Sequence, residues 1–388
     1  MEALKLSPDL QLASRMDAVI DGAIARAQIV GAVMLIARRG TVVYQRAAGA
    51  ADREASRAMT LDTLFRYASL TKPIVCATAL KLIESGRFGL DDALTKWIPE
   101  FRPRLADGRE PVITTRHLLT HTAGLGYGFS EPEDGPYHRA NVSDGMDQPG
   151  LRFDENLRRL ASVPLLFPPG TAWNYSLATD VLGKVIERAS GVSLPEMVAR
   201  TITEPLKMRD TAFVARDPAR LAVPYASGTA QPVRMGDPHT VPFPPGAMLF
   251  SPSRILDARS YPSGGTGMAG TAGDFLTFLE ALRRGGEGLL RPTTIQMMTS
   301  NAIGNLPMLM GPGWGFGLGV AVLRDRVAAN VPQGAGTWRW GGVYGHHWFV
   351  DPKHELSVVV LTNTALVGMI GEFPDALCRA LYASIATR

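Results

Sequence analysis

Cysteine is scarce in this chain of 388 residues, which has only Cys76 and Cys378, far apart in the sequence. Two such residues make neither a metal-binding spacing nor a disulfide framework. Cys76 lies in an apolar pattern of helical period. We therefore expect both side chains to be buried, unreactive thiols.

Long hydrophobic runs and a basic leader are also missing. No apolar stretch reaches the roughly 20 residues that cross a bilayer as a helix. The first residues, "MEALKLSPDLQLASRM", lack the basic start and apolar run of a secretory signal. We expect a cytoplasmic protein without a membrane partner, although a chain from which a signal had been cleaved would read the same.

Charge of one sign is not concentrated anywhere. Forty basic residues alternate with 36 acidic ones, for a net charge of +4. A nucleic-acid surface needs a concentrated basic face, so we expect no nucleic-acid partner. The composition is 46% hydrophobic and 20% charged, which can bury a large core. The length favours two domains.

The order of expected elements divides the chain into three parts. Helices and long loops fill residues 91–204, and a Pro- and Gly-rich stretch of predicted binding loops covers 215–265. The other predicted helices are 10–28, 69–85, 271–286 and 371–385, and the predicted strands are 31–40, 41–49, 337–345, 346–352 and 356–364. We expect one sheet built from both chain ends with helices on its faces, in a domain of residues 1–90 and 205–388. Residues 91–204 would form a mainly helical domain, with the site in the cleft between them.

A serine and a lysine three positions apart open the helix that begins near residue 69. Ser69 and Lys72 would share one face of it, and Pro73 is tolerated only in a first turn. Free N–H groups at a helix start suit a nucleophile whose attack creates an oxyanion. A Ser-x-x-Lys pair also arises by chance roughly once in a chain of this size, so alone it is weak.

Other catalytic designs find little support. No serine lies in Gly-x-Ser-x-Gly. His117 and His121 have the spacing of a zinc helix but lack its Glu, so we interpret them as structural. His346 and His347 are adjacent in a strand and point to opposite faces, although one could line the cleft. We expect no metal and no cofactor.

Four motifs in order carry a resemblance: "SLTK" at 69–72, "LLTHTAGLGYG" at 118–128, "YSLATDVLG" at 175–183 and "WGGVYGHHWFVDP" at 340–352. Together they closely resemble the family VIII bacterial carboxylesterases of the esterase-B type. Those enzymes share the α+β fold of class C β-lactamases and penicillin-binding proteins. The resemblance implies an antiparallel sheet flanked by helices, a mainly helical lobe and an active site in the cleft between them.

The resemblance also implies catalytic roles. Ser69 matches the nucleophile, Lys72 its lysine partner and Tyr175 the tyrosine of the second motif. The oxyanion hole would be formed by the backbone N–H groups of Ser69 and Val343. Which of Lys72 and Tyr175 is the base stays open, because such a pair can titrate as a unit.

Substrate-binding positions follow from the same motifs. Trp340, Gly341 and Gly342 match the cleft strand, and Tyr127 matches an aromatic residue at the cleft rim that is as easily packing as substrate contact. Leu177 stands where a β-lactamase has Asn, and Trp340 where it has Lys. Both changes remove polar groups that would hold an amide and a carboxylate, so we expect no efficient β-lactamase action.

The expected activity is hydrolysis of short-chain acyl esters, from acetate to about hexanoate, through a Ser69 acyl-enzyme. Acyl transfer to alcohols in water, weak β-lactamase action and D-amino-acid peptidase action are alternatives on the same scaffold. A penicillin-recognising binding protein without turnover is a third class, which intact Ser69, Lys72 and Tyr175 disfavour. The natural ester, its enantiomer preference and the oligomeric state stay open.

Overall fold

One large sheet, built from both ends of the chain, forms the centre of the molecule. The computed structural model describes residues 5–7 and 9–385, and nine described strands form the sheet in the order β1-β3-β2-β15-β14-β13-β12-β11, with β4 beside β3. Only β1 and β3 pair in parallel. The strands are β1 (Lys5–Leu6), β2 (Gly31–Arg38), β3 (Thr41–Asp52), β4 (Arg57–Ala58), β11 (Trp314–Phe316), β12 (Ala321–Leu323), β13 (Trp338–Gly342), β14 (His346–Asp351) and β15 (Leu356–Thr362).

Burial on both faces explains the composition of the central strands. β15 reads "LSVVVLT", and every one of its residues is buried. It pairs with β2, where Val33 faces Leu361 and Leu35 faces Val359. β-Branched residues pack well on such a pleated surface. The N-terminal and C-terminal parts of the chain therefore meet in the middle of the sheet, as predicted.

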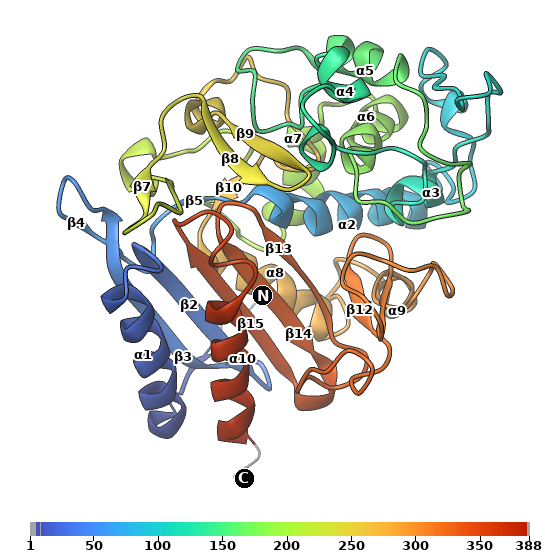
Figure 1. The fold of residues 1–388 in the computed structure, drawn as a ribbon. Helices are drawn as coiled ribbons and strands as arrows, with labels where there is room; N and C mark the ends of the chain where they lie inside the picture. Colours follow the sequence, from blue (N-terminus) through green and yellow to red (C-terminus); the bar gives the residue numbers. More distant parts are fainter. Residues whose placement is uncertain (1–4, 8, 386–388) are drawn as a thin grey trace.

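Helices cover both faces of this sheet (Figure 1). α1 (Leu10–Ala25) and α10 (Glu372–Ile385) pack together on one face over β2 and β15. α1 starts where the side chain of Asp9 accepts a hydrogen bond from the Leu12 amide, a standard N-cap. α8 (Ala272–Arg283) contacts β2 and β15 from the other face.

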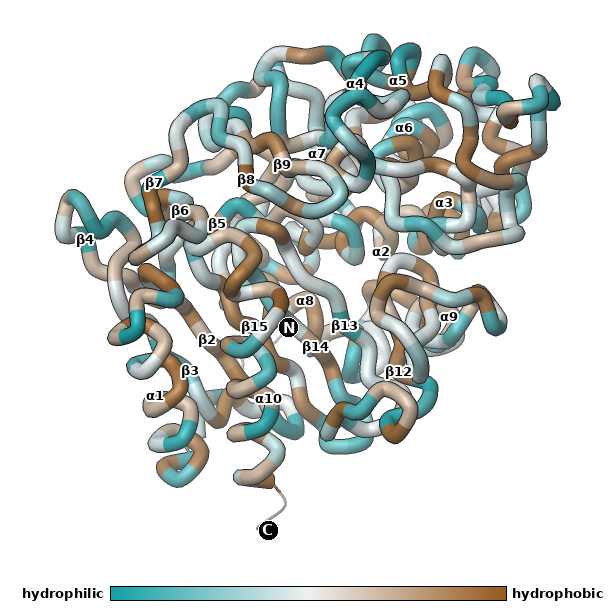
Figure 2. Tube along the Cα trace, in the orientation of Figure 1, coloured by the Kyte–Doolittle hydropathy of each residue, from teal (hydrophilic) through white to brown (hydrophobic). Residues whose placement is uncertain are grey.

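Helices and loops dominate the chain between the two sets of strands. They are α2 (Thr71–Glu84), α3 (Thr115–Leu119), α4 (Pro136–Arg139), α5 (Phe153–Ala161), α6 (Ala178–Ser190) and α7 (Leu194–Val198). α2 lies between the sheet and the other helices (Figure 1), and Figure 2 shows α4 and α5, at the top of the view, as mostly hydrophilic. The domain limits 1–90 with 205–388 and 91–204 stay a prediction.

The Pro- and Gly-rich stretch contains more structure than predicted. It forms the hairpin β8 (His239–Phe243) and β9 (Gly246–Phe250) and the short pair β6 (Tyr225–Ala226) and β7 (Val233–Arg234). Within the predicted helical segment, the helix that carries His117 is α3, which is only five residues long. α9 (Pro292–Met298) was not predicted. No described helix is both long and apolar enough to cross a membrane.

Candidate active site

Ser69 lies in a tight turn at the start of α2. The short strand β5 (Phe65–Arg66) leads into a single 3₁₀ turn, Ala68–Leu70, and α2 follows at Thr71. Ala68 has a φ of 47°, which is uncommon for a residue with a Cβ. Hydrogen bonds to the next segment hold this turn, because the Tyr67 amide donates to the Met268 carbonyl at 2.8 Å and the Tyr67 hydroxyl to the Thr271 carbonyl at 2.6 Å.

The structure brings Ser69, Lys72 and Tyr175 together. The Tyr175 hydroxyl is 2.6 Å from Ser69 Oγ, and Lys72 Nζ is 3.4 Å from the same oxygen. Lys72 Nζ also lies over the Tyr175 ring, 4.6 Å from its centroid. The hydroxyl therefore has two neighbours that can accept or return its proton.

Lys72 is buried and has two further polar partners. Its Nζ donates to the Tyr127 hydroxyl at 2.9 Å and to the Gly265 carbonyl at 3.0 Å. The carboxyl group of Asp180, on α6, lies nearby and is also buried. Burial raises the pKa of Asp180, and the Ser263 hydroxyl and the Lys72 charge act in the opposite direction. The amine therefore has four neighbours, which are the Ser69 hydroxyl, the Tyr127 hydroxyl, the Gly265 carbonyl and, nearby, the Asp180 carboxyl group.

Tyr127 differs from its predicted place at the cleft rim. It is only 2% exposed, stacks on Phe129 with 4.6 Å between ring centroids, and does not line the cavity at Ser69. Burial, and secondarily Tyr175, hold its pKa well above the ordinary value. Its hydroxyl therefore stays protonated and accepts a hydrogen bond from Lys72 Nζ, and a substrate contact of Tyr127 stays a prediction.

Trp340 reaches the tyrosine from β13. Its Nε1–H donates to the Tyr175 hydroxyl oxygen at 3.2 Å, and the two rings are 5.0 Å apart. Trp173 also lines the cavity, but its Nε1 has no hydrogen-bond partner among the described residues. Trp340 thus combines an apolar wall with a polar contact that the sequence motif did not reveal.

A cavity of about 360 Å³ opens beside Ser69. Its wall is mostly apolar and comes from the helical part, from the β8–β9 hairpin and from β13 with its neighbouring loops. The lining residues are Ser69, Phe129, Ser130, Trp173, Asn174, Tyr175, Phe243, Met248, Leu309, Met310, Arg339, Trp340, Gly341, Val343, Met369 and Ile370. Of the predicted binding positions, Trp340 and Gly341 lie on this wall, whereas Gly342 and Leu177 are buried behind it.

The close approach of β13 to the Ser69 turn explains Gly342. A Cβ at this position would lie 2.6 Å from the Tyr67 carbonyl oxygen and 2.9 Å from the His346 ring. Val343 follows directly and lines the cavity together with Ser69. Neither the Ser69 nor the Val343 backbone N–H has an acceptor among the residues that the structure describes. Both amides are therefore available to a ligand.

The histidines have structural partners. His117 caps α3 by accepting from the Thr114 amide, and His121 Nδ1 is 3.1 Å from Ser176 Oγ. His346 Nε2 is 2.8 Å from the Arg66 carbonyl. His347 and His346 are both buried and neither lines the cavity. Across the described chain, no group of three His, Cys, Asp or Glu side chains is arranged to hold a metal ion.

Three partners of the site were missed from the sequence. The Gly265 carbonyl comes from "SGGTG", a stretch predicted only as a binding loop, and Asp180 from the second motif, four residues after Ser176. The third is the indole N–H of Trp340, a residue that was predicted only as a substrate-binding position. The one available signal was the pair of adjacent glycines in "SGGTG", since glycines permit a close approach of the backbone to another group.

Comparisons with known proteins agree on the family. The beta-lactamase family profile matches residues 16–372. Esterase EstB from Burkholderia gladioli is 52% identical over 375 residues, which cover 96% of this chain and 95% of that protein. The solved structure of EstCE1, described as a hydrolase with promiscuous acyltransferase activity, is 45% identical with a TM-score of 0.92, covering 96% of this chain and 98% of that one.

A fungal enzyme marks a more distant branch. The structure of simvastatin synthase (LovD) from Aspergillus terreus is 25% identical with a TM-score of 0.75, and the match covers 95% of this chain and 97% of that chain.

The predicted α+β fold, with its large antiparallel sheet flanked by helices, is thereby confirmed. The chain belongs to the beta-lactamase family, in its esterase-B-type branch.

Proposed function

We propose that this protein is a serine carboxylesterase that hydrolyses short-chain acyl esters through an acyl-enzyme on Ser69. The observation that carries the proposal is the contact of Ser69 Oγ with both the Tyr175 hydroxyl, at 2.6 Å, and Lys72 Nζ, at 3.4 Å, beside a mostly apolar cavity. The esterase relatives support the reaction class.

The proposed reaction has two acyl transfers. Ser69 Oγ attacks the ester carbonyl while its proton passes to the Tyr175–Lys72 pair, and the pair then protonates the departing alcohol. Water attacks the acyl-enzyme by the reverse path and releases the acid. The shorter distance favours the Tyr175 oxygen as the immediate proton acceptor.

The N–H groups of Ser69 and Val343 would bind the developing oxyanion. Both lack acceptors and both residues border the cavity. One such donor contributes about 2.7–4 kcal/mol to transition-state binding in comparable sites. Trp340, by donating to the Tyr175 oxygen, would stabilise negative charge there when Tyr175 gives up its own proton.

The test compares two serine variants on p-nitrophenyl butyrate. Ser69→Ala should lower turnover by about 10⁴–10⁶-fold, the loss expected for a deleted nucleophile. Ser130→Ala is the matched control, because Ser130 lines the same cavity and its hydroxyl forms no hydrogen bond with the described residues. Turnover by Ser69→Ala similar to that of the wild type would refute the assignment.

Acyl transfer to alcohols is the second candidate. The apolar cavity disfavours water beside the acyl-enzyme, and the 45% identical relative is described as having promiscuous acyltransferase activity. Product analysis with vinyl butyrate and benzyl alcohol in water should then give benzyl butyrate in addition to butyric acid. Butyric acid as sole product would exclude this activity.

Weak β-lactamase or D-amino-acid peptidase action has less support. Leu177 and Trp340 replace the polar groups that would hold an amide and a carboxylate, and Leu177 is buried behind the cavity wall. Nitrocefin turnover tests this directly.

A cytoplasmic location also stays a proposal from the sequence, which cell fractionation would check.

A further inference from the structure

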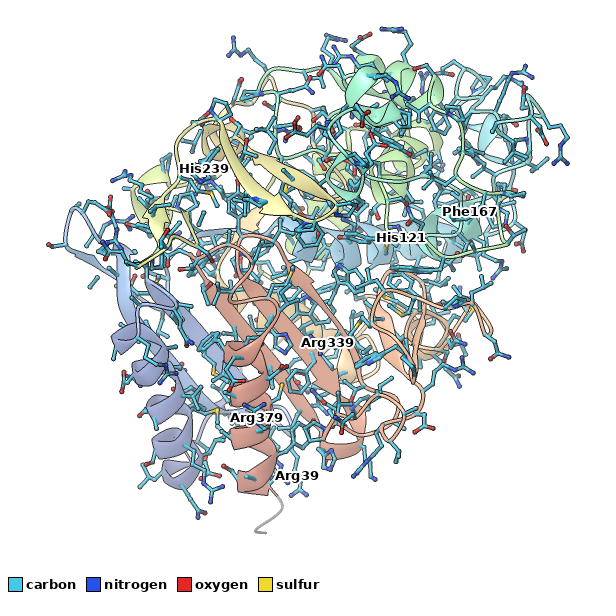
Figure 3. All side chains as sticks on the ribbon, in the orientation of Figure 1. Arg39, His121, Phe167, His239, Arg339 and Arg379 are labelled. Carbon is cyan, nitrogen blue, oxygen red and sulfur yellow. The ribbon has the colours of Figure 1, made fainter. Side chains whose placement is uncertain are left out.

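An arginine shares the cavity wall with the candidate nucleophile. Arg339 precedes Trp340 on β13, and Arg339, Gly341 and Val343 all line the cavity that Ser69 borders. Residues at i and i+2 of a strand point to the same side, which accounts for the shared wall position of Arg339 and Gly341. Figure 3 labels Arg339 on the sheet, below the level of His121 in the view.

The guanidinium lies beside His347. Its Nη2 is 3.1 Å from His347 Nδ1, and His347 is the cross-strand partner of Gly341, two residues along β13 from Arg339. The Arg339 side chain therefore contacts the neighbouring strand β14. On the other side, its Cζ lies over the Trp314 ring, 5.6 Å from the centroid.

Burial lowers the pKa of Arg339, and Cys378 and the Asp375 carboxylate act in the opposite direction. Arg339 forms no ion pair with a carboxylate among the residues that the structure describes, and its Nε is buried without a hydrogen-bond partner. Burial, and next the Arg339 charge, keep the pKa of His347 well below its ordinary value, so His347 is neutral. The Cys378 thiol beyond it is neutral too, because burial raises its pKa to about 11.

The guanidinium keeps an unused donor. Arg339 is partly exposed, but its Nε is buried, and a buried polar group is normally hydrogen-bonded. The other lining residues are all uncharged, so Arg339 is the one charged side chain that this cavity offers an anion among the described residues. A guanidinium with a free N–H suits a carboxylate, which accepts from two N–H groups at once.

We propose that Arg339 forms an anion subsite in the Ser69 cavity, and that the preferred ester substrates carry a carboxylate. This inference rests on the proposed esterase function. Val343 is four residues after Arg339, or roughly 13 Å along an extended chain, and an extended arginine side chain can cover part of that distance. The carboxylate should therefore lie about 7–13 Å from the ester carbonyl.

The test uses three substrate pairs that differ only in charge. They are 4-butanoyloxybenzoate, (4-butanoyloxyphenyl)acetate and mono(4-nitrophenyl) suberate, each compared with its neutral carboxamide. The measured quantity is the ratio of kcat/KM for the carboxylate to kcat/KM for the carboxamide. Because each ratio is taken on one enzyme preparation, the amount of folded protein cancels.

Wild type should prefer at least one carboxylate, and Arg339→Gln should lower that ratio by about tenfold or more, as expected for a lost charge-assisted hydrogen bond. Arg339→Lys should retain part of the preference. Arg326→Gln is the charge-matched control and should leave the ratio unchanged, because Arg326 is exposed and forms no ion pair within the described part of the chain.

Two outcomes distinguish a failure of the anion subsite from a failure of the proposed esterase function. Equal ratios in wild type and Arg339→Gln, with normal turnover of the neutral carboxamides, would overturn the anion subsite and leave the esterase function intact. No turnover of any ester by the wild type would instead defeat the proposed function itself.

Discussion

At the scale of single residues, the candidate site depends on side chains that hold other side chains. Lys72 reaches Ser69 only because Tyr127 and the Gly265 carbonyl fix its Nζ, and Tyr175 is fixed in turn by Trp340. Motifs in the sequence predicted Ser69, Lys72 and Tyr175 as the catalytic residues. The structure places Lys72 Nζ and the Tyr175 hydroxyl within hydrogen-bond distance of Ser69 Oγ. The roles of Tyr127 and the Trp340 indole could not be predicted, because they depend on tertiary packing of distant segments.

Two tryptophans in the cavity allow a matched test of one hydrogen bond. Trp340→Phe removes the N–H that donates to Tyr175 while an aromatic wall remains, so kcat on p-nitrophenyl butyrate should fall by about tenfold. Trp173→Phe removes an N–H that has no partner and should change kcat by less than about threefold. Equal losses in the two variants would show that only wall shape matters.

At the scale of elements, three short segments converge on the nucleophile. The turn before α2 supplies Ser69, the end of β13 supplies Val343, and the glycine-rich loop before β10 (Ala269–Gly270) supplies the carbonyl for Lys72. Regular periodicity predicted α1, α8, α10 and the central strands close to their observed limits. It missed the β8–β9 hairpin, because Pro242, Pro244 and Pro245 interrupt the alternation that marks a strand.

Gly265 gives the element-scale prediction. A Cβ there would lie 2.5 Å from Asp180 Oδ2 and 3.2 Å from Lys72 Nζ, so Gly265→Ala must displace the lysine or the loop. Misplacing a catalytic group by an ångström costs about 10²-fold in rate, and we expect kcat/KM on p-nitrophenyl butyrate to fall by that order.

The control for this variant is another glycine. Gly273→Ala lies in the first turn of α8, where the nearest atom would be 3.9 Å away, and Ala favours the helix. It should keep full activity and an unchanged melting temperature. Wild-type activity in Gly265→Ala would contradict the assigned contact between this loop and Lys72.

At the scale of the whole molecule, buried histidines couple stability to pH. His346 is fully buried and bonds the Arg66 carbonyl, and burial lowers its pKa from 6.5 to about 4. Between these values the unfolded chain binds a proton that the folded protein does not. The contribution of His346 to stability is therefore complete above pH 6.5 and is lost as the pH falls toward 4.

His346→Gln should reveal this contribution, because glutamine can still donate to the Arg66 carbonyl but does not titrate. The wild type should lose about 2 kcal/mol more unfolding free energy than the variant between pH 7 and pH 5. Chemical denaturation at the two pH values measures the difference. Asp144, whose pKa burial raises to about 8, acts with the opposite sign but equally in both proteins, so it cancels. Equal losses of unfolding free energy in the wild type and in His346→Gln would contradict the assignment to His346.

The pairing of β2 with β15 has a consequence for biosynthesis. More than 300 residues separate these two neighbours, so the middle of the sheet cannot close until β15 has left the ribosome. Until then the nascent chain carries an unpaired apolar edge, the kind of surface that chaperones shield. Ser69 would emerge long before Val343, so catalytic competence should appear only after β15 has emerged.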